Sequence, residues 1–148
     1  MDNYLLIFSK TPDNATMHPS KNCYKVIKSN GEISGYKYGI KNKIKPFVNP
    51  KILKFSKKEI AILEGCLSVP DLYGHVTRPA EIDVEAQDRL GKTFKNHYKG
   101  LAARIIQHEI DHLNGTLFID HIHDQNGKLF RVEKDKKGQE HFIEIVYA

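Results

Sequence analysis

The sequence has no tryptophan and only two methionines and two cysteines in 148 residues. Two cysteines, Cys23 and Cys66, are too few for a disulfide-dense scaffold, so a single bridge, two free thiols or a metal thiolate remain. Long apolar runs are missing too, because stretches such as residues 4–8 are far shorter than the roughly 18 residues that a membrane-spanning helix requires. No secretory signal pattern opens the chain. We therefore expect a protein of the cytoplasm, in a bacterial, phage or organellar context, with no membrane partner.

Glycine and proline are also sparse, with 10 and 6 residues, which excludes a collagen-like or low-complexity chain. The mixture of 40% apolar and 28% charged residues is typical of a globular protein. Because 148 residues is about the size of one ordinary domain, we expect residues 1–148 to form a single domain with one core.

Acidic residues are scarce in the first 60 residues, where four of them face 12 lysines, whereas the other 88 residues hold 11 basic and 14 acidic groups. A basic N-terminal part can attract nucleic acid, a ribosomal surface or an acidic peptide. These lysines are interspersed with apolar residues, and no zinc-finger or helix-turn-helix pattern accompanies them. We therefore expect a solvated basic surface that would allow proximity to the ribosome, and no specific nucleic-acid partner.

Turn signals and alternating apolar residues predict mostly antiparallel sheet. Asn30-Gly31 favours a tight hairpin turn, and residues 82–87 alternate between apolar and polar side chains. Pro46 and Pro50 flank a short segment, after which we expect a brief strand and a polar turn at residues 56–59. The strands predicted in this way are residues 24–27, 33–38, 51–55, 82–87, 92–96, 129–132 and 141–147.

One long helix is predicted over residues 100–114. Its apolar residues recur at intervals of three and four, and Gly115 stands where a helix commonly ends. Since this helix is apolar on more than one side, we expect it to be buried against the sheets. The fold class is therefore predicted to be α+β, with antiparallel β-sheets packed around one central helix.

This helix carries the spacing of a metal site. His108 and His112 lie four residues apart, so their imidazoles project from one helix face and can converge on a cation, with Glu109 beside them. The alternative is a pair of hydrogen-bonded core histidines. That alternative is disfavoured, because burying two imidazoles and a carboxylate without a cation is costly unless each group finds a partner.

Cys66 is the candidate for a third metal ligand. A thiolate and two imidazoles would leave a fourth position for water, whose pKa a cation lowers, and Glu109 would then act as the general base. The alternatives for Cys66 are a small buried hydrophobe or a disulfide to Cys23.

Two motifs resemble those of peptide deformylases, which remove the formyl group from the N-terminal formyl-methionine of new chains. They are E-G-C-L-S at residues 64–68 and Q-H-E-I-D-H-L at residues 107–113. Flanking segments extend the resemblance over residues 46–121. The resemblance implies a metallohydrolase of protein biosynthesis with a deformylase-like fold around one metal-binding helix, acting on N-formyl-methionyl peptides.

The resemblance also implies a role for individual residues. The metal would be Fe²⁺, with Zn²⁺, Ni²⁺ or Co²⁺ as substitutes. Glu109 would move the proton, and the backbone N–H of Leu67 would help to hold the oxyanion. The remaining implied roles are metal ligation by Cys66, His108 and His112, peptide binding by Gly65, and a methionine pocket lined by Leu101 and Ile105.

The family's first motif, G-x-G-h-A-A-x-Q (h apolar), is missing, because all four glutamines follow Cys66. This departure implies a divergent or N-terminally truncated member of the family. Residues 1–45 would then be a divergent basic part, in which residues 4–8 form the strand that follows the first motif. Residues 122–148 would form a hairpin in place of the family's C-terminal helix. Loss of one oxyanion donor typically lowers kcat by about 10²- to 10³-fold. Asn22 or Asn30 would donate a hydrogen bond to the oxyanion in place of that glutamine.

Two other functions are consistent with these residues. One is a deformylase-like protein that binds metal or formyl-peptide with weak or no turnover. The other is a zinc protease of the H-E-x-x-H kind, which the upstream cysteine ligand disfavours. Deformylation would be distinguished from both by release of formate.

Overall fold

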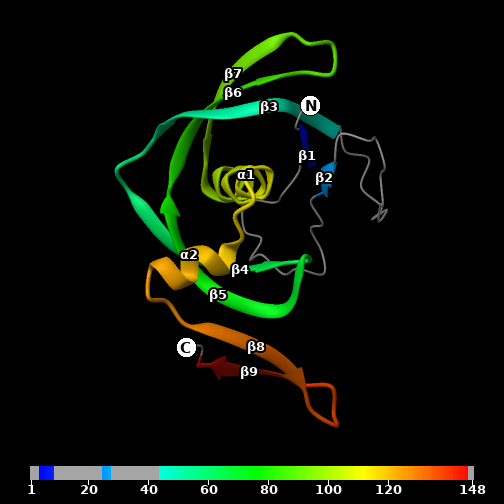
Figure 1. Cartoon of the computed structure of the whole chain (residues 1–148), viewed down its shortest axis with the longest axis vertical. Helices are drawn as coiled ribbons and strands as arrows, with labels where there is room; N and C mark the ends of the chain where they lie inside the picture. The colour runs from blue at the N-terminus through cyan, green and yellow to red at the C-terminus, as the bar shows by residue number, and fades with distance from the viewer. Residues whose placement is uncertain (1–3, 9–24, 28–43, 147–148) are drawn as a thin grey trace.

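The computed structural model describes residues 4–8, 25–27 and 44–146. Within these residues the chain forms strands and two helices (Figure 1). In chain order the elements are β1 (Tyr4–Phe8), β2 (Lys25–Ile27), β3 (Ile44–Phe55), β4 (Glu59–Cys66), β5 (Val69–Pro79), β6 (Glu81–Gln87), β7 (Thr93–Lys99), α1 (Gly100–Leu113), α2 (Phe118–Asp124), β8 (Leu129–Lys134) and β9 (Glu140–Ile145).

The strands form two sheets, with α1 between them (Figure 1). One sheet has the order β2-β1-β3-β6-β7 and the other the order β4-β5-β8-β9, and neighbouring strands in these two orders are antiparallel. The predicted α+β class, with antiparallel sheets around a central helix, is confirmed. In the part of the chain described above, no helix is long and apolar enough to cross a membrane.

The first sheet packs on α1 through apolar side chains. Strand β6 alternates as predicted, and its buried residues Ile82, Val84 and Ala86 face the helix. Burial of such side chains is the main force that holds the helix against this sheet. The cluster consists of Phe47, Ile82, Val84, Ala86, Ala103, Ile106 and Ile110, with Ile52, Phe94 and Tyr98 at its margin.

The predicted boundary of β3 is wrong, because the strand begins at Ile44 rather than after Pro50. Its register against β6 shifts between Val48 and Lys51, and Asn49 has a φ of 49°. This shift is a β-bulge, and proline is tolerated at a bulge because the extra residue does not need a ladder hydrogen bond.

The predicted hairpins formed by β6 with β7 and by β8 with β9 are confirmed, whereas the turn of the one predicted at Asn30-Gly31 lies outside the described residues. The predicted strand at residues 24–27 corresponds to β2, whereas residues 33–38 lie outside the described residues. The strand after the turn at residues 88–91 runs on to Lys99, three residues further than predicted. In the β8–β9 hairpin, Asp135 Oδ1 accepts hydrogen bonds from the N–H groups of Lys137 and Gln139, which closes the turn.

Helix α1 agrees closely with its prediction and is buried from Ala103 to Ile110. Its C-terminal end closes at Gly115, which has a φ of 76° and donates its N–H to the carbonyl of His112. The short helix α2 was not predicted. It packs Phe118 and Ile122 against Val76 of β5, so it covers the second sheet beside the metal-site motifs.

Candidate metal centre

The structure brings Cys66, His108 and His112 together between β4 and α1. Cys66 is the last residue of β4, whereas both histidines lie on α1, one turn apart. Cys66 Sγ lies 3.2 Å from His112 Nε2, which lies 3.2 Å from His108 Nε2. The alternative of a disulfide between Cys66 and Cys23 is not tested, because Cys23 lies outside the described residues.

These three donor atoms fit a single divalent cation. One sulfur and two imidazole nitrogens are the donor types that zinc and other first-row cations accept, and all three lie within 4.8 Å of one another. Around one tetrahedral ion with ordinary bond lengths, such donors lie about 3.3–3.6 Å apart. The donor separations of 3.2 Å are close to that requirement.

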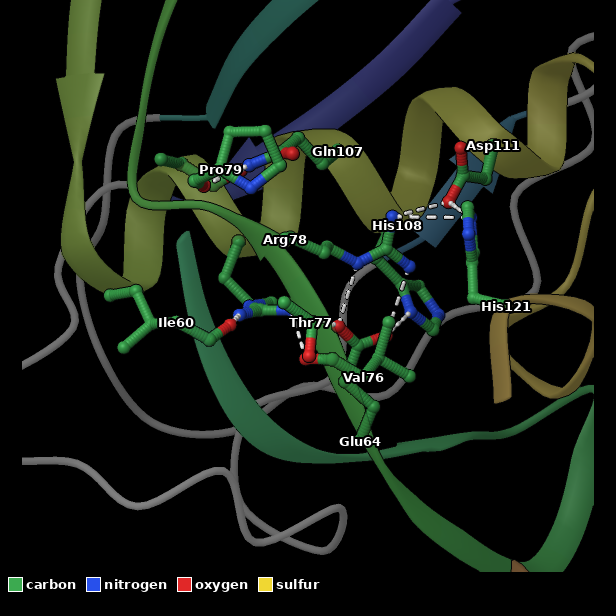
Figure 2. Close-up of polar contacts among 12 residues, drawn as sticks. Ile60, Glu64, Val76, Thr77, Arg78, Pro79, Gln107, His108, Asp111 and His121 are labelled. Carbon is green, nitrogen blue, oxygen red and sulfur yellow. Dashed lines mark hydrogen bonds and ion pairs between the residues drawn. The ribbon is translucent and has the colours of Figure 1, made fainter. Parts of the chain in front are cut away.

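Glu64 orients the His108 imidazole. Its carboxylate is fully buried, at 0% exposure, and Oε2 lies 2.9 Å from His108 Nδ1. A proton on Nδ1 completes this hydrogen bond and leaves the lone pair of Nε2 free for a cation. Figure 2 shows the Glu64 carboxylate directed at both His108 and Arg78.

Two arginines hold the Glu64 carboxylate. Arg78 donates from Nε to Oε1 at 2.8 Å and from Nη2 to Oε2 at 3.1 Å, and Arg104 Nη1 donates to Oε1 at 2.9 Å. Sequence reasoning gave none of these three residues a role. The available signals were that Glu64 lies two residues before Cys66 on a strand and Arg104 four residues before His108 on the helix.

Further polar contacts connect α1 to β5 and α2. Gln107 Nε2 donates to the carbonyl of Pro79 at 3.0 Å. Arg78 Nη1 donates to Asp111 Oδ2 at 2.5 Å, and His121 Nε2 lies 2.8 Å from the same oxygen (Figure 2). Asp111, which precedes His112 on α1, therefore joins α1 to β5 and α2.

Contacts among these groups shift the pKa of each. Burial raises the pKa of Glu64, but hydrogen bonds from His108 and Arg78 outweigh it and lower the pKa to about 2. Burial lowers the pKa of His108, but hydrogen bonds to Cys66 and Glu64 raise it to about 9. Burial raises the pKa of the Cys66 thiol, yet hydrogen bonds from His108 and His112 bring it down to about 5. Without a cation, the site therefore holds a thiolate beside an imidazolium.

Glu109 is a buried carboxylate beside these donors, with 7% of its surface exposed. Burial raises its pKa, while the nearby His108 and His112 lower it to a smaller extent. Among the described residues its side chain has no hydrogen-bond partner, in contrast to Glu64. An unpaired carboxylate of raised pKa is suited to accept and return a proton.

The structure describes four of the other residues to which a site role was given. Leu67 follows Cys66 in the turn between β4 and β5, with 64% of its surface exposed. Gly65 lies under the Tyr73 ring, where an added Cβ would come within 2.6 Å of Cε1. Leu101 is half-buried and Ile105 is buried on α1, before His108. Asn22 and Asn30, the suggested replacement donors, lie outside the described residues.

Comparisons with known proteins match this region. A family model described as polypeptide deformylase matches residues 20–128. A peptide deformylase of Rhizobium meliloti (strain 1021) is 54% identical over 76 residues, which are 51% of this chain and 44% of that protein. The chain spans about half the length of the curated relatives it matches.

Solved structures of deformylases are similar to this fold. A probable peptide deformylase from Synechococcus phage S-SSM7 has a TM-score of 0.57 at 35% identity, covering 80% of this chain and 62% of that one. The class I type b peptide deformylase of Acinetobacter baumannii, solved with Met-Ala-Ser bound, has a TM-score of 0.52 at 44% identity. That match covers 53% of this chain and 50% of the other.

Proposed function

Because the chain belongs to the polypeptide deformylase family, we propose that it is a metal-dependent hydrolase that removes the formyl group from N-terminal formyl-methionine of nascent peptides. One observation carries the proposal: three metal donors lie next to a buried carboxylate that has no partner among the described residues. A divalent cation at Cys66, His108 and His112 would supply the Lewis acidity that activates water at neutral pH. Fe²⁺ is proposed as the native ion, and Zn²⁺, Ni²⁺ or Co²⁺ would fit the same donors.

Glu109 would carry the proton in this reaction. It would accept a proton from the attacking water and deliver it to the amine that leaves when the bond between the formyl carbon and the nitrogen breaks. Its burial supports this role, because burial raises the pKa of the carboxyl group towards the working pH. Glu64 would not compete for this role, since four hydrogen bonds keep it ionised.

The peptide would bind along the end of β4. The backbone N–H of Leu67 would help to hold the oxyanion, and Gly65 would form a hydrogen bond with the backbone of the bound peptide. Ile105 and Leu101, which lie about one and two turns before His108 respectively, would line the methionine pocket. The bound Met-Ala-Ser of the Acinetobacter baumannii deformylase supports a peptide that begins with methionine.

We further propose a single domain acting in the cytoplasm on nascent chains, with the basic N-terminal part facing the ribosome.

Formate release from formyl-Met-Ala-Ser tests this function. We expect Fe²⁺-loaded wild type to release formate, and Glu109→Gln to lower kcat by about 10²- to 10⁴-fold while keeping its metal. Glu133→Gln, at an exposed position of β8, is the matched control and should be unaffected. If wild type and Glu109→Gln release formate equally slowly, the chain binds its ligands without catalysing deformylation.

A further inference from the structure

Arg104 connects the metal helix to both strands that flank the metal site. It lies one turn before His108 on α1 and is 2% exposed. Its Nη1 donates to Glu64 Oε1 at 2.9 Å and to the carbonyl of Val76 at 2.8 Å, and its Nη2 donates to the carbonyl of Ile60. One guanidinium thus contacts β4 twice and β5 once.

The spacing between α1 and β4 determines whether the metal donors meet. Cys66 is carried by β4, whereas His108 and His112 are carried by α1. Ala103, Ile106 and Ile110 of α1 pack on the other sheet, so these side chains do not fix this spacing. Towards β4, the connection is made by the hydrogen bonds of Arg104 and His108 to Glu64 and by the hydrogen bond of Arg104 to the carbonyl of Ile60.

Arg104 also completes the set of donors around Glu64. The carboxylate accepts two bonds from Arg78, one from His108 and one from Arg104. Burying a second guanidinium beside Arg78 costs desolvation energy, and apolar residues can often replace a whole buried ion pair without loss of stability. Stability alone therefore does not explain a buried arginine at this position.

We propose that Arg104 is a positioning residue, which holds α1 at the distance from β4 where Cys66 and the two imidazoles can share one cation. It acts through Glu64, His108 and the carbonyl of Ile60, and it is not itself a donor to the cation. The inference rests on the proposed metal site, and it adds to that site the residue that sets its geometry.

The test measures cation affinity in Arg104→Met and Arg104→Lys. The Kd for Zn²⁺ would be measured by chelator competition, and the Co²⁺-loaded proteins would be compared by their absorption spectra. We expect Arg104→Met to bind Zn²⁺ about 10- to 100-fold more weakly, with a changed Co²⁺ spectrum. The Zn²⁺ affinity of Arg104→Lys should lie between those of Arg104→Met and wild type, because one ammonium group cannot make all three contacts. Arg131→Met, at an exposed position of β8, is the matched control and should bind as wild type does.

A double-mutant cycle separates positioning from general stability. Because Arg104 acts in part through Glu64, Arg104→Met should lower Zn²⁺ affinity by a smaller factor in a Glu64→Gln background than in wild type. An equal loss in both backgrounds, or wild-type affinity and spectrum in Arg104→Met, would overturn the inference. If Arg104→Met does not fold, Arg104→Lys decides: weaker binding supports the inference and wild-type binding overturns it. Wild type that binds no cation would instead overturn the proposed function as well.

Discussion

His108 Nδ1 lies 2.9 Å from Glu64 Oε2, in the buried space where α1 faces β4. This contact gives the imidazole a fixed orientation and leaves its Nε2 towards Cys66 and His112. Glu64 is itself held by Arg78 and Arg104. The metal donors therefore depend on a buried carboxylate that makes no bond to the cation, and the first prediction concerns this group.

Replacing Glu64 by glutamine should weaken both the fold and the metal site. The variant keeps the size of the side chain but leaves the buried guanidinium of Arg104 without a charged partner. We expect the free energy of unfolding to fall by about 3–5 kcal/mol and cation affinity to fall by about 10- to 100-fold. Urea unfolding of the metal-free protein and chelator competition measure the two effects.

A surface pair supplies the control for Glu64. Glu85 forms an exposed ion pair with Lys95 on the first sheet, at 3.0 Å. Glu85→Gln should change the free energy of unfolding by less than about 1 kcal/mol, because solvent screens exposed pairs. Equal costs for the two glutamine variants would contradict the structural role given to Glu64.

The Cys66 thiol should react as a thiolate at neutral pH when no metal is bound. Because the pKa of Cys66 is lowered to about 5, the thiolate fraction rises as the pH passes through about 5 and is complete at pH 7. Alkylation by iodoacetamide, measured in a Cys23→Ser background, should therefore be half-maximal near that pH. His108→Ala should move the midpoint upward, and a wild-type midpoint near the usual ~8.5 would contradict the thiolate–imidazolium pairing.

Gly65 should not tolerate even one added methyl group. A Cβ there would lie 2.6 Å from Tyr73 Cε1, which is closer than two non-bonded carbon atoms can approach. We expect Gly65→Ala to lower the free energy of unfolding by about 1–3 kcal/mol. In a Tyr73→Ala background the same change should cost less, since the ring is gone. A cost that is the same in both backgrounds would show that the ring is not the reason for glycine.

The parts of the fold that were predicted correctly have strong local patterns. Helix α1 has a continuous spacing of three and four, and β6 alternates at every residue, so each could be identified without knowing its neighbours. The boundary of β3 was missed because a bulge at Asn49 lets the strand continue past Pro50. A bulge depends on the pairing with β6, which the sequence of β3 alone does not specify.

The sequence predicted the three metal donors of the candidate site, but not the hydrogen bonds that hold them in place. The spacing of His108 and His112 and the nature of Cys66 were sufficient to suggest a shared cation, and the structure brings these residues together. The contacts among Glu64, Arg78 and Arg104 were not predicted, because these residues are 14 to 40 positions apart and no local period relates them. Only the register of β4 with β5, and the packing of α1 against both, places them in contact.

X-ray absorption of the Zn²⁺-loaded protein tests most directly whether one cation is held by a cysteine and two histidines. The spectrum should contain one sulfur at about 2.3 Å and imidazole nitrogens at about 2.0–2.1 Å from the metal. The sulfur contribution should be lost in Cys66→Ala. A wild-type spectrum without sulfur in the first coordination shell would contradict the account.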